Sequence, residues 1–211
     1  MTMNRPSPRD GCADITFKQE LARKATHMGA LVIPGGYFFL GLEKSTALAI
    51  MIPITLAMIL VDIARLRKWK FWQKVGRPII GRIIRQHEEN GDFTGATYIL
   101  TSSCFTIALF SKPIAIAALA FIIVGDSFAA IIGRRFGRHR FGRKSVEGSL
   151  ACLFGTGIVA CIGPLFGLDL RVALAGAVVA AVTEALSTRV DDNVSVPLVS
   201  GLAMTLLARV F

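Results

Sequence analysis

Cysteine is scarce in this sequence, and its spacing forms no recognisable motif. The cysteines neither pair at metal-ligand spacing nor reach the density of a secreted disulfide scaffold. Most of them fall in apolar stretches, where a thiol behaves as a small hydrophobic side chain. We therefore interpret all of them as inert thiols, at Cys12, Cys104, Cys152 and Cys161.

Targeting signals, repeats and linkers are also lacking. Residues 1–13 are polar and show neither the apolar stretch nor the small-residue cleavage site of a secretory signal, so no signal peptide is expected. No internal repeat or low-complexity tract interrupts the chain. The sequence predicts a polar tail over residues 1–14 and a single domain over residues 15–211.

Acidic residues are few, 14 against 24 Lys and Arg, which gives a formal net charge of +10. Such a charge is typical of nucleic-acid-binding proteins. Yet 53% of the residues are hydrophobic, and long uncharged stretches such as residues 93–111 would overfill a small soluble core. A membrane protein separates apolar spans from cationic loops. We therefore expect an integral membrane protein that binds the lipid bilayer and no nucleic acid.

The apolar stretches predict an all-α fold, a polytopic helical bundle with about seven transmembrane helices. Several stretches are shorter than the roughly 20 residues of a full crossing, so they should draw turns from their flanks. The predicted spans are residues 27–42, 45–61, 93–110, 113–133, 148–166, 172–186 and 195–208.

The cations predict the orientation. Twenty of the 24 Lys and Arg fall on one side of this topology, in the N-terminal 28 residues, before the third span, after the fourth span and at Arg189. The positive-inside rule places these segments and the N-terminus in the cytoplasm, at a cell inner membrane or its equivalent, and the C-terminus outside. Residues 64–90 mix Trp, Phe and Ile with cations, which predicts an interfacial amphipathic helix broken near Gly76 and Pro78.

Four polar groups fall at the predicted cytoplasmic ends of spans, and the first lies before span one. Glu20, Arg23, Lys24 and His27 are spaced i, i+3, i+4 and i+7, which places them on one helix face. An Arg fork beside a Lys point charge is suited to several phosphate oxygens. The alternative is an ion-pair ladder that anchors lipid headgroups.

The second group is Asp126, which lies seven residues before the end of its predicted span, or about 10 Å along the helix. An ionisable residue at that depth is costly and predicts a functional role with a metal ion or a cationic partner. The alternative is a structural contact between helices.

The third group is the glycine-rich basic loop of residues 133–148. Backbone amides and cations spaced in this way are able to wrap a polyphosphate. The loop is not a Walker A motif, because Arg143 interrupts its Gly-Lys-Ser order and an apolar helix precedes it. A basic juxtamembrane loop is otherwise a topology signal. The candidate nucleotide-binding residues are Gly133, Arg134, Gly137, Arg138, Lys144, Ser145 and Gly148.

The fourth group is acidic. Glu184 lies near the end of the sixth predicted span, and Asp191, Asp192 and Asn193 occupy the following loop. Carboxylate and amide oxygens are the ligands that magnesium prefers. A solvated turn is the alternative. Glu147, where the fifth span begins, is a further candidate metal ligand.

Together these groups resemble the CTP-dependent lipid kinases, the polyprenol kinase family that includes dolichol kinase, phytol kinase and CTP-dependent diacylglycerol kinase. The resemblance runs from about Glu20 to Pro197. It implies phosphoryl transfer from CTP to a membrane lipid alcohol, with magnesium. The phosphatidate cytidylyltransferases look similar over residues 125–148, but their C-terminal signature has no counterpart here.

On this resemblance, Asp126 is expected to hold magnesium together with Glu147 or with the group from Glu184 to Asn193. Arg23, Lys24, Lys144 and Arg138 would neutralise phosphate oxygens. Asp126 or His27 would accept the alcohol proton. Cytidylyl transfer to a lipid and ion transport without nucleotide chemistry remain the alternatives, and the sequence leaves the oligomeric state open.

Overall fold

The computed structural model describes residues 17–69, 93–142, 144–187 and 191–210. Within these ranges the protein is helical except for one two-stranded hairpin, so the predicted all-α class is confirmed. The predicted tail and residues 70–90 of the predicted interfacial segment lie outside the described residues. The elements are α1 Phe17–Gly29, α2 Val32–Phe39, α3 Lys44–Leu66, α6 Gly95–Leu109, α7 Lys112–Phe136, β1 Arg140–Phe141, β2 Lys144–Ser145, α8 Val146–Ile162, a 3-10 turn Gly163–Phe166, α9 Leu170–Leu186 and α10 Asp192–Leu207.

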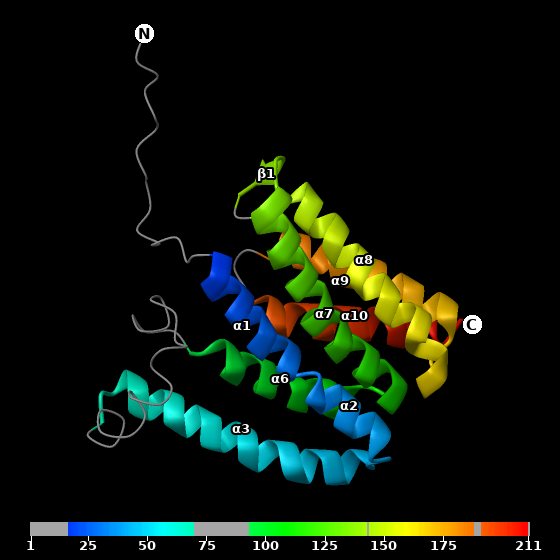
Figure 1. The fold of residues 1–211 in the computed structure, drawn as a ribbon. Coiled ribbons are helices and arrows are strands. Elements are labelled where there is room, and N and C mark those ends of the chain that lie inside the picture. Colours follow the sequence, from blue (N-terminus) through cyan, green and yellow to red (C-terminus); the bar gives the residue numbers. More distant parts are fainter. Residues whose placement is uncertain (1–16, 70–92, 143, 188–190, 211) are drawn as a thin grey trace.

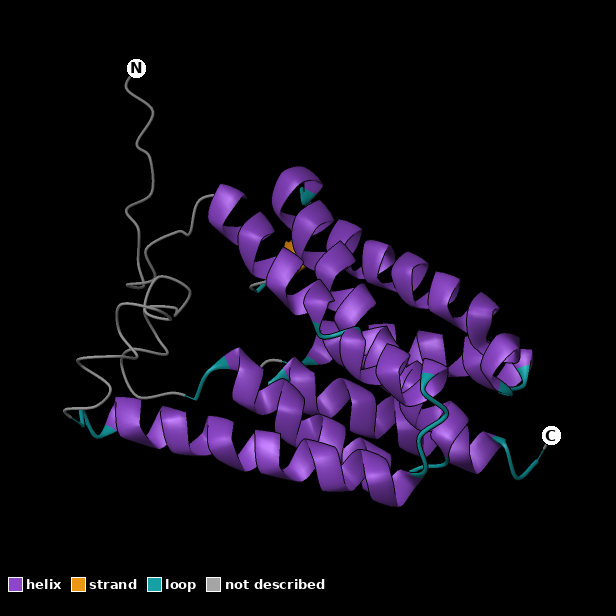
Figure 2. Cartoon of the chain, turned by 60° about the horizontal axis from the view of Figure 1, so that its bottom comes forward, coloured by secondary structure: helices purple, strands orange, loops and turns teal. Residues whose placement is uncertain are grey.

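Helix α7 forms the centre of the bundle, and α1, α2, α6, α8, α9 and α10 all pack against it (Figure 1). Its first half is buried on every side from Ile114 to Ile123, as expected for a helix that is apolar all round. Helix α3 packs on α6 at one flank of the bundle (Figure 2). The buried side chains of α7 therefore meet several neighbouring helices.

Three helices in the described part of the chain are long and apolar enough to cross a membrane: α3, α7, and α8 with its 3-10 extension. Helices α6 and α10 are apolar but shorter. The structure thus supports a membrane protein, whereas the predicted number of seven transmembrane helices is not confirmed.

The predicted first span, residues 27–42, is not one continuous helix, and that prediction was wrong. Helix α1 ends at Gly29 and α2 begins at Val32. Pro34 has no backbone N–H and would break the ladder inside a longer helix. The interruption instead places Pro34 in the first turn of α2, where no intrahelical donor is needed.

A buried carboxylate joins the C-terminal end of α3 to the start of α6. Asp62 accepts hydrogen bonds from the Arg65 Nε at 3.0 Å, from the Thr94 backbone N–H at 2.8 Å and from the Thr97 hydroxyl at 2.6 Å. Helix α3 runs through residues 64–66, so the first residues of the predicted interfacial segment belong to this helix.

Candidate active site

The predicted face of α1 packs against the C-terminal half of α7. Glu20 is 1% exposed, and the Arg23 guanidinium donates two hydrogen bonds to its carboxylate, one of them 3.1 Å long. Arg134, near the end of α7, lies 3.5 Å from the same carboxylate. Burial alone would raise the pKa of Glu20, but the Arg23 hydrogen bond and the nearby cations outweigh it and lower that pKa below its usual value.

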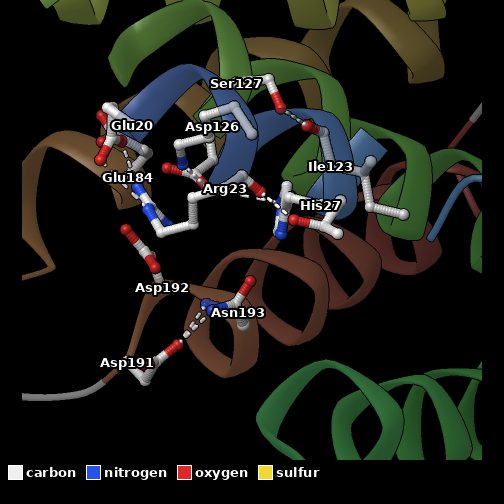
Figure 3. A network of polar contacts seen from close by, with 12 residues as sticks. Glu20, Arg23, His27, Ile123, Asp126, Ser127, Glu184, Asp191, Asp192 and Asn193 are labelled. Atoms are coloured by element: carbon white, nitrogen blue, oxygen red, sulfur yellow. Dashed lines mark hydrogen bonds and ion pairs between the residues drawn. The ribbon is translucent and has the colours of Figure 1, made fainter. Parts of the chain in front are cut away.

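Lys24 makes the central contact of the site. Its buried ammonium group donates to Oδ2 of Asp126 on α7. His27 Nε2 lies 3.3 Å from the same oxygen. The two groups that the sequence placed on separate segments, α1 and α7, are therefore in direct contact, as Figure 3 shows for Asp126 and its neighbours.

One nitrogen of the His27 ring makes a hydrogen bond, and the other lies near Asp126 without one. Its hydrogen bond goes to the backbone carbonyl of Ile122. Nε2 is buried and has no hydrogen-bond partner, so the donor to Ile122 is Nδ1. In the neutral ring that carries its proton on Nδ1, Nε2 is an acceptor.

The hairpin β1–β2 positions Lys144. Arg140 pairs with Ser145 across the hairpin, and Gly142 takes the left-handed conformation at its tip. The Lys144 ammonium group donates to the Glu184 backbone carbonyl and carboxylate, and lies 3.5 Å from Asp192 Oδ2. Burial lowers the pKa of Lys144, but the Glu184 and Asp192 carboxylates outweigh burial and raise it above its usual value.

The glycines of the predicted loop have a packing role. A Cβ at Gly137 would lie 2.7 Å from the Ser145 Oγ, and one at Gly148 would lie 3.0 Å from the Ala129 carbonyl oxygen. Ser145 caps α8 by accepting from the Gly148 N–H at 3.1 Å. The absence of side chains at Gly133, Gly137 and Gly148 thus lets α7, the hairpin and the start of α8 approach one another closely.

Two buried oxygen atoms on α9 and α10 have no hydrogen-bond partner: Glu184 Oε2 and Asn193 Oδ1. Asp191 is the N-cap of α10 and accepts from the Asn193 N–H at 2.9 Å. Asp192, the first residue of α10, points toward the cluster in Figure 3. Burial, and then the charge of Asp126, raise the pKa of Asp192 to about 6.

Two predicted site residues lie apart from this group. Glu147 accepts a 2.8 Å hydrogen bond from Nδ1 of the exposed His139 ring, and it also accepts from the His139 backbone N–H. Arg138 is exposed on the hairpin loop. Among the described residues, no three His, Cys, Asp or Glu side chains already form a metal-binding group.

We call the site residues that contact one another, without Glu147 and Arg138, the inner cluster. It comprises the interacting charged and polar side chains of α1, α7, β2, α9 and α10: Glu20, Arg23, Lys24, His27, Asp126, Arg134, Lys144, Glu184, Asp192 and Asn193.

The sequence did not reveal a cavity of about 720 Å³ beside the inner cluster. Arg23, His27 and Asn193 line its polar end, while α2, α3 and α6 supply an apolar wall. The α3 contribution follows one helix face, from Ala47 to Met58. Such periodicity is equally typical of a helix face packed in a protein core, so the cavity could not be predicted from the sequence pattern.

Comparison with known proteins finds several relatives with assigned names. The chain is 26% identical to CTP-dependent diacylglycerol kinase 1 of Saccharomyces cerevisiae, over 94% of this chain and 77% of the yeast protein. It is 34% identical to probable phytol kinase 2 of Oryza sativa, over 59% of this chain and 48% of that protein. It is also 34% identical to farnesol kinase of Arabidopsis thaliana, over 51% of this chain and 40% of that protein.

No family model and no solved structure matches the chain. The fold and the inner cluster define a helical membrane protein with ion pairs gathered at one end of its bundle. The named relatives support its membership of the polyprenol and CTP-dependent lipid kinase family. The resemblance drawn from the sequence motifs is thereby confirmed.

Proposed function

We propose that this protein is a kinase that transfers the γ-phosphoryl group of CTP to a membrane lipid alcohol. The observation that carries the proposal is the inner cluster itself. Buried cations and carboxylates from separate elements converge there, directly at the polar end of an apolar cavity. Phosphoryl transfer depends on positioning and charge neutralisation, and a cluster next to an apolar space supplies both for a lipid acceptor.

The proposed topology has seven passages through the membrane. Helices α1 and α2 together make a broken first passage, followed by α3, α6, α7, α8, α9 and α10. The N-terminus and the inner cluster face the cytoplasm, where CTP is present, and the C-terminus lies outside. The distribution of Lys and Arg supports this orientation.

Four cations are available for the triphosphate. Arg23 and Arg134 both contact Glu20, while Lys24 contacts Asp126 and Lys144 contacts Glu184. The guanidinium groups offer planar pairs of donors, and the ammonium groups offer point charges. In the proposed complex, phosphate oxygens share these cations with the carboxylates and are neutralised as charge moves toward the leaving CDP.

The oxygen atoms of the cluster fit magnesium. Glu184 Oε2 and Asn193 Oδ1 are buried without partners, and the Asp126 and Asp192 carboxylates lie in the same cluster. These are hard oxygen donors of the kind that magnesium binds. Magnesium held by these residues would supply positive charge that neutralises the phosphate oxygens. Asp191 is engaged as the cap of α10, and Glu147 is paired with His139, so we leave both outside the proposed metal site.

His27 is the proposed general base. Its unpartnered Nε2 accepts the proton of the lipid hydroxyl. The alcohol oxygen then bonds to the γ-phosphorus, the bond from that phosphorus to the β–γ bridging oxygen breaks, and CDP leaves. Asp126, 3.3 Å from Nε2, stabilises the imidazolium that forms.

The test is an assay of the purified protein with γ-labelled CTP and a panel of lipid alcohols and phosphatidate. We expect labelled phospholipid and CDP as products. Pyrophosphate and a CDP-lipid would instead identify a cytidylyltransferase, and the absence of nucleotide turnover would remove the kinase proposal.

Asp126→Asn should abolish the transfer. Asp169→Asn is the matched control, because it makes the same chemical change at the N-cap of α9. Asn caps a helix as well as Asp does, so this control should keep its stability and its activity.

A further inference from the structure

We propose that the 720 Å³ cavity holds the hydrocarbon tail of the acceptor alcohol, with the hydroxyl group at the polar end beside the inner cluster. Gly36 keeps the deeper part of this cavity open. The inference rests on the proposed kinase function, and it adds the site and the depth at which the acceptor binds. The volume lies within the range of about 300–1,000 Å³ that is typical of small-molecule sites.

The cavity extends along the bundle away from the inner cluster. Its α3 wall runs from Ala47 to Met58, and 11 residues of helix span about 16 Å. In the proposed topology α3 runs from the outside at Lys44 to the cytoplasm at Leu66, so Ala47 lies at the end of this wall that is farther from the inner cluster. A lipid whose head lies at the inner cluster would therefore extend its tail along this wall toward Ala47.

The polar end of the cavity has unused acceptors for a hydroxyl group. His27 Nε2 and Asn193 Oδ1 are buried without hydrogen-bond partners, and both residues line the cavity. A buried acceptor without a partner is costly, and the lipid hydroxyl would satisfy His27 Nε2 while the proposed magnesium would take Asn193 Oδ1. Figure 3 shows His27 and Asn193 beside Arg23, which also lines the cavity. The head of the acceptor is thus placed next to the groups proposed to grip phosphate.

Gly36 offers a way to close the deeper part of the cavity without disturbing the fold. It lines the cavity from α2, and a Cβ added there would meet no atom within 4 Å. Gly35, its neighbour, does not line the cavity, and a Cβ there would meet only the Phe39 ring at 4.0 Å. Leucine at either position improves helix propensity to the same degree. Gly36→Leu and Gly35→Leu are therefore a matched pair that differs in whether the new side chain enters the cavity.

The position of Gly36 makes the effect depend on chain length. It lies in the second turn of α2, nine residues after His27 and beyond the break between α1 and α2. A short tail ends before it reaches this point, but a long tail must pass it. Excluding about three methylene groups from the cavity lowers the affinity for a long tail on the order of 50-fold.

The experiment measures kcat/KM for CTP-dependent phosphorylation with two acceptor pairs, dioctanoylglycerol with dioleoylglycerol and geraniol with phytol. We expect Gly36→Leu to lose activity toward the long member of the pair that the wild type uses and to retain activity toward the short one. Gly35→Leu should match the wild type on both. The inference would be overturned if both substitutions changed kcat/KM equally, or if Gly36→Leu lowered kcat/KM equally for long and short acceptors.

A second measurement separates this inference from the kinase proposal. A long-chain alcohol with a terminal diazirine is photo-crosslinked to the purified protein, and the labelled peptide is mapped. Labelling of α2 or of α3 near Ala47, suppressed by Gly36→Leu, supports the tail site even if no lipid is phosphorylated. Labelling elsewhere refutes the tail site even if CTP turnover is found.

Discussion

The contact between Lys24 and Asp126 makes a quantitative prediction. Lys24 is 1% exposed, so Asp126→Asn leaves a buried ammonium group without its carboxylate partner. Removing one partner of a buried ion pair costs about 3–5 kcal/mol. Because the Asp126 side chain retains 14% exposure, we expect the lower end of that range, about 3 kcal/mol. For a chain of this size that loss lowers Tm by roughly 6–12 °C.

The converse substitution should cost less. Lys24→Met leaves Asp126 with His27, whose Nε2 lies 3.3 Å away and can take up a proton to replace the lost charge. The double variant Lys24→Met/Asp126→Asn places two neutral side chains together, so most of the lost stability should return. If Lys24→Met lowered Tm more than Asp126→Asn did, this description of the ion pair would be wrong.

The assay combines thermal unfolding in detergent micelles with CTP-dependent phosphorylation on the same preparations. If the two side chains serve the reaction as proposed, the double variant is stable and inactive. Recovery of turnover together with stability would show that the pair only supports the fold. That result would end the catalytic assignment of both residues without affecting the similarity of the chain to the named lipid kinases.

Three further outcomes are expected. Asp62→Ala should lower Tm because it removes the carboxylate that accepts from the buried Thr94 and Thr97 donors, at about 1–3 kcal/mol each, whereas an unchanged Tm would contradict a stabilising role for Asp62 between α3 and α6. Because the pKa of Glu20 is lowered by folding, this carboxylate stabilises the protein above its unfolded pKa, and that stabilisation is lost as pH falls through its folded pKa. The difference in Tm between the wild type and Glu20→Gln should therefore shrink on acidification. A difference that grows would contradict the stabilising role of the Glu20 carboxylate. Chelation of divalent cations should stop CTP turnover without lowering Tm by more than a few degrees, and turnover that survives chelation would remove magnesium from the proposal.

Local spacing in the sequence predicted the parts of the site that lie within one element. Glu20 and Arg23 share a face of α1 because the helix repeats every 3.6 residues, and they are paired in the structure. Asp126 could be singled out because a carboxylate inside an apolar helix is costly without a partner. The identity of that partner, Lys24, depends on how α1 packs on α7, which spacing along the chain does not specify.

The features that the sequence did not predict depend on packing between elements. Glu147 was grouped with the metal ligands by its position at the start of a span, yet the return of the hairpin brings it to His139 instead. The sequence did not predict the interruption between α1 and α2, because residues 27–42 are mostly apolar. Hydropathy does not indicate whether Pro34 lies inside a helix or in the first turn of a new one. The sequence did not single out Asp62, because its structural role depends on hydrogen bonds from Thr94 and Thr97, which lie more than thirty residues away along the chain.

The interrupted first passage explains how one element can serve both substrates. Helix α1 carries Arg23 and Lys24 toward the acidic residues of the inner cluster, and Arg23 and His27 also line the cavity. Because α1 ends at Gly29, α2 can begin afresh and present Gly36 to the same cavity. A single uninterrupted helix would fix the two faces by its own periodicity, whereas two helices joined by a break orient them independently. Replacing Pro34 to restore one continuous helix would therefore rotate the phosphate-binding face of α1 relative to the tail-binding face of α2. We expect such a variant to lose more activity toward long-chain acceptors than toward short-chain ones.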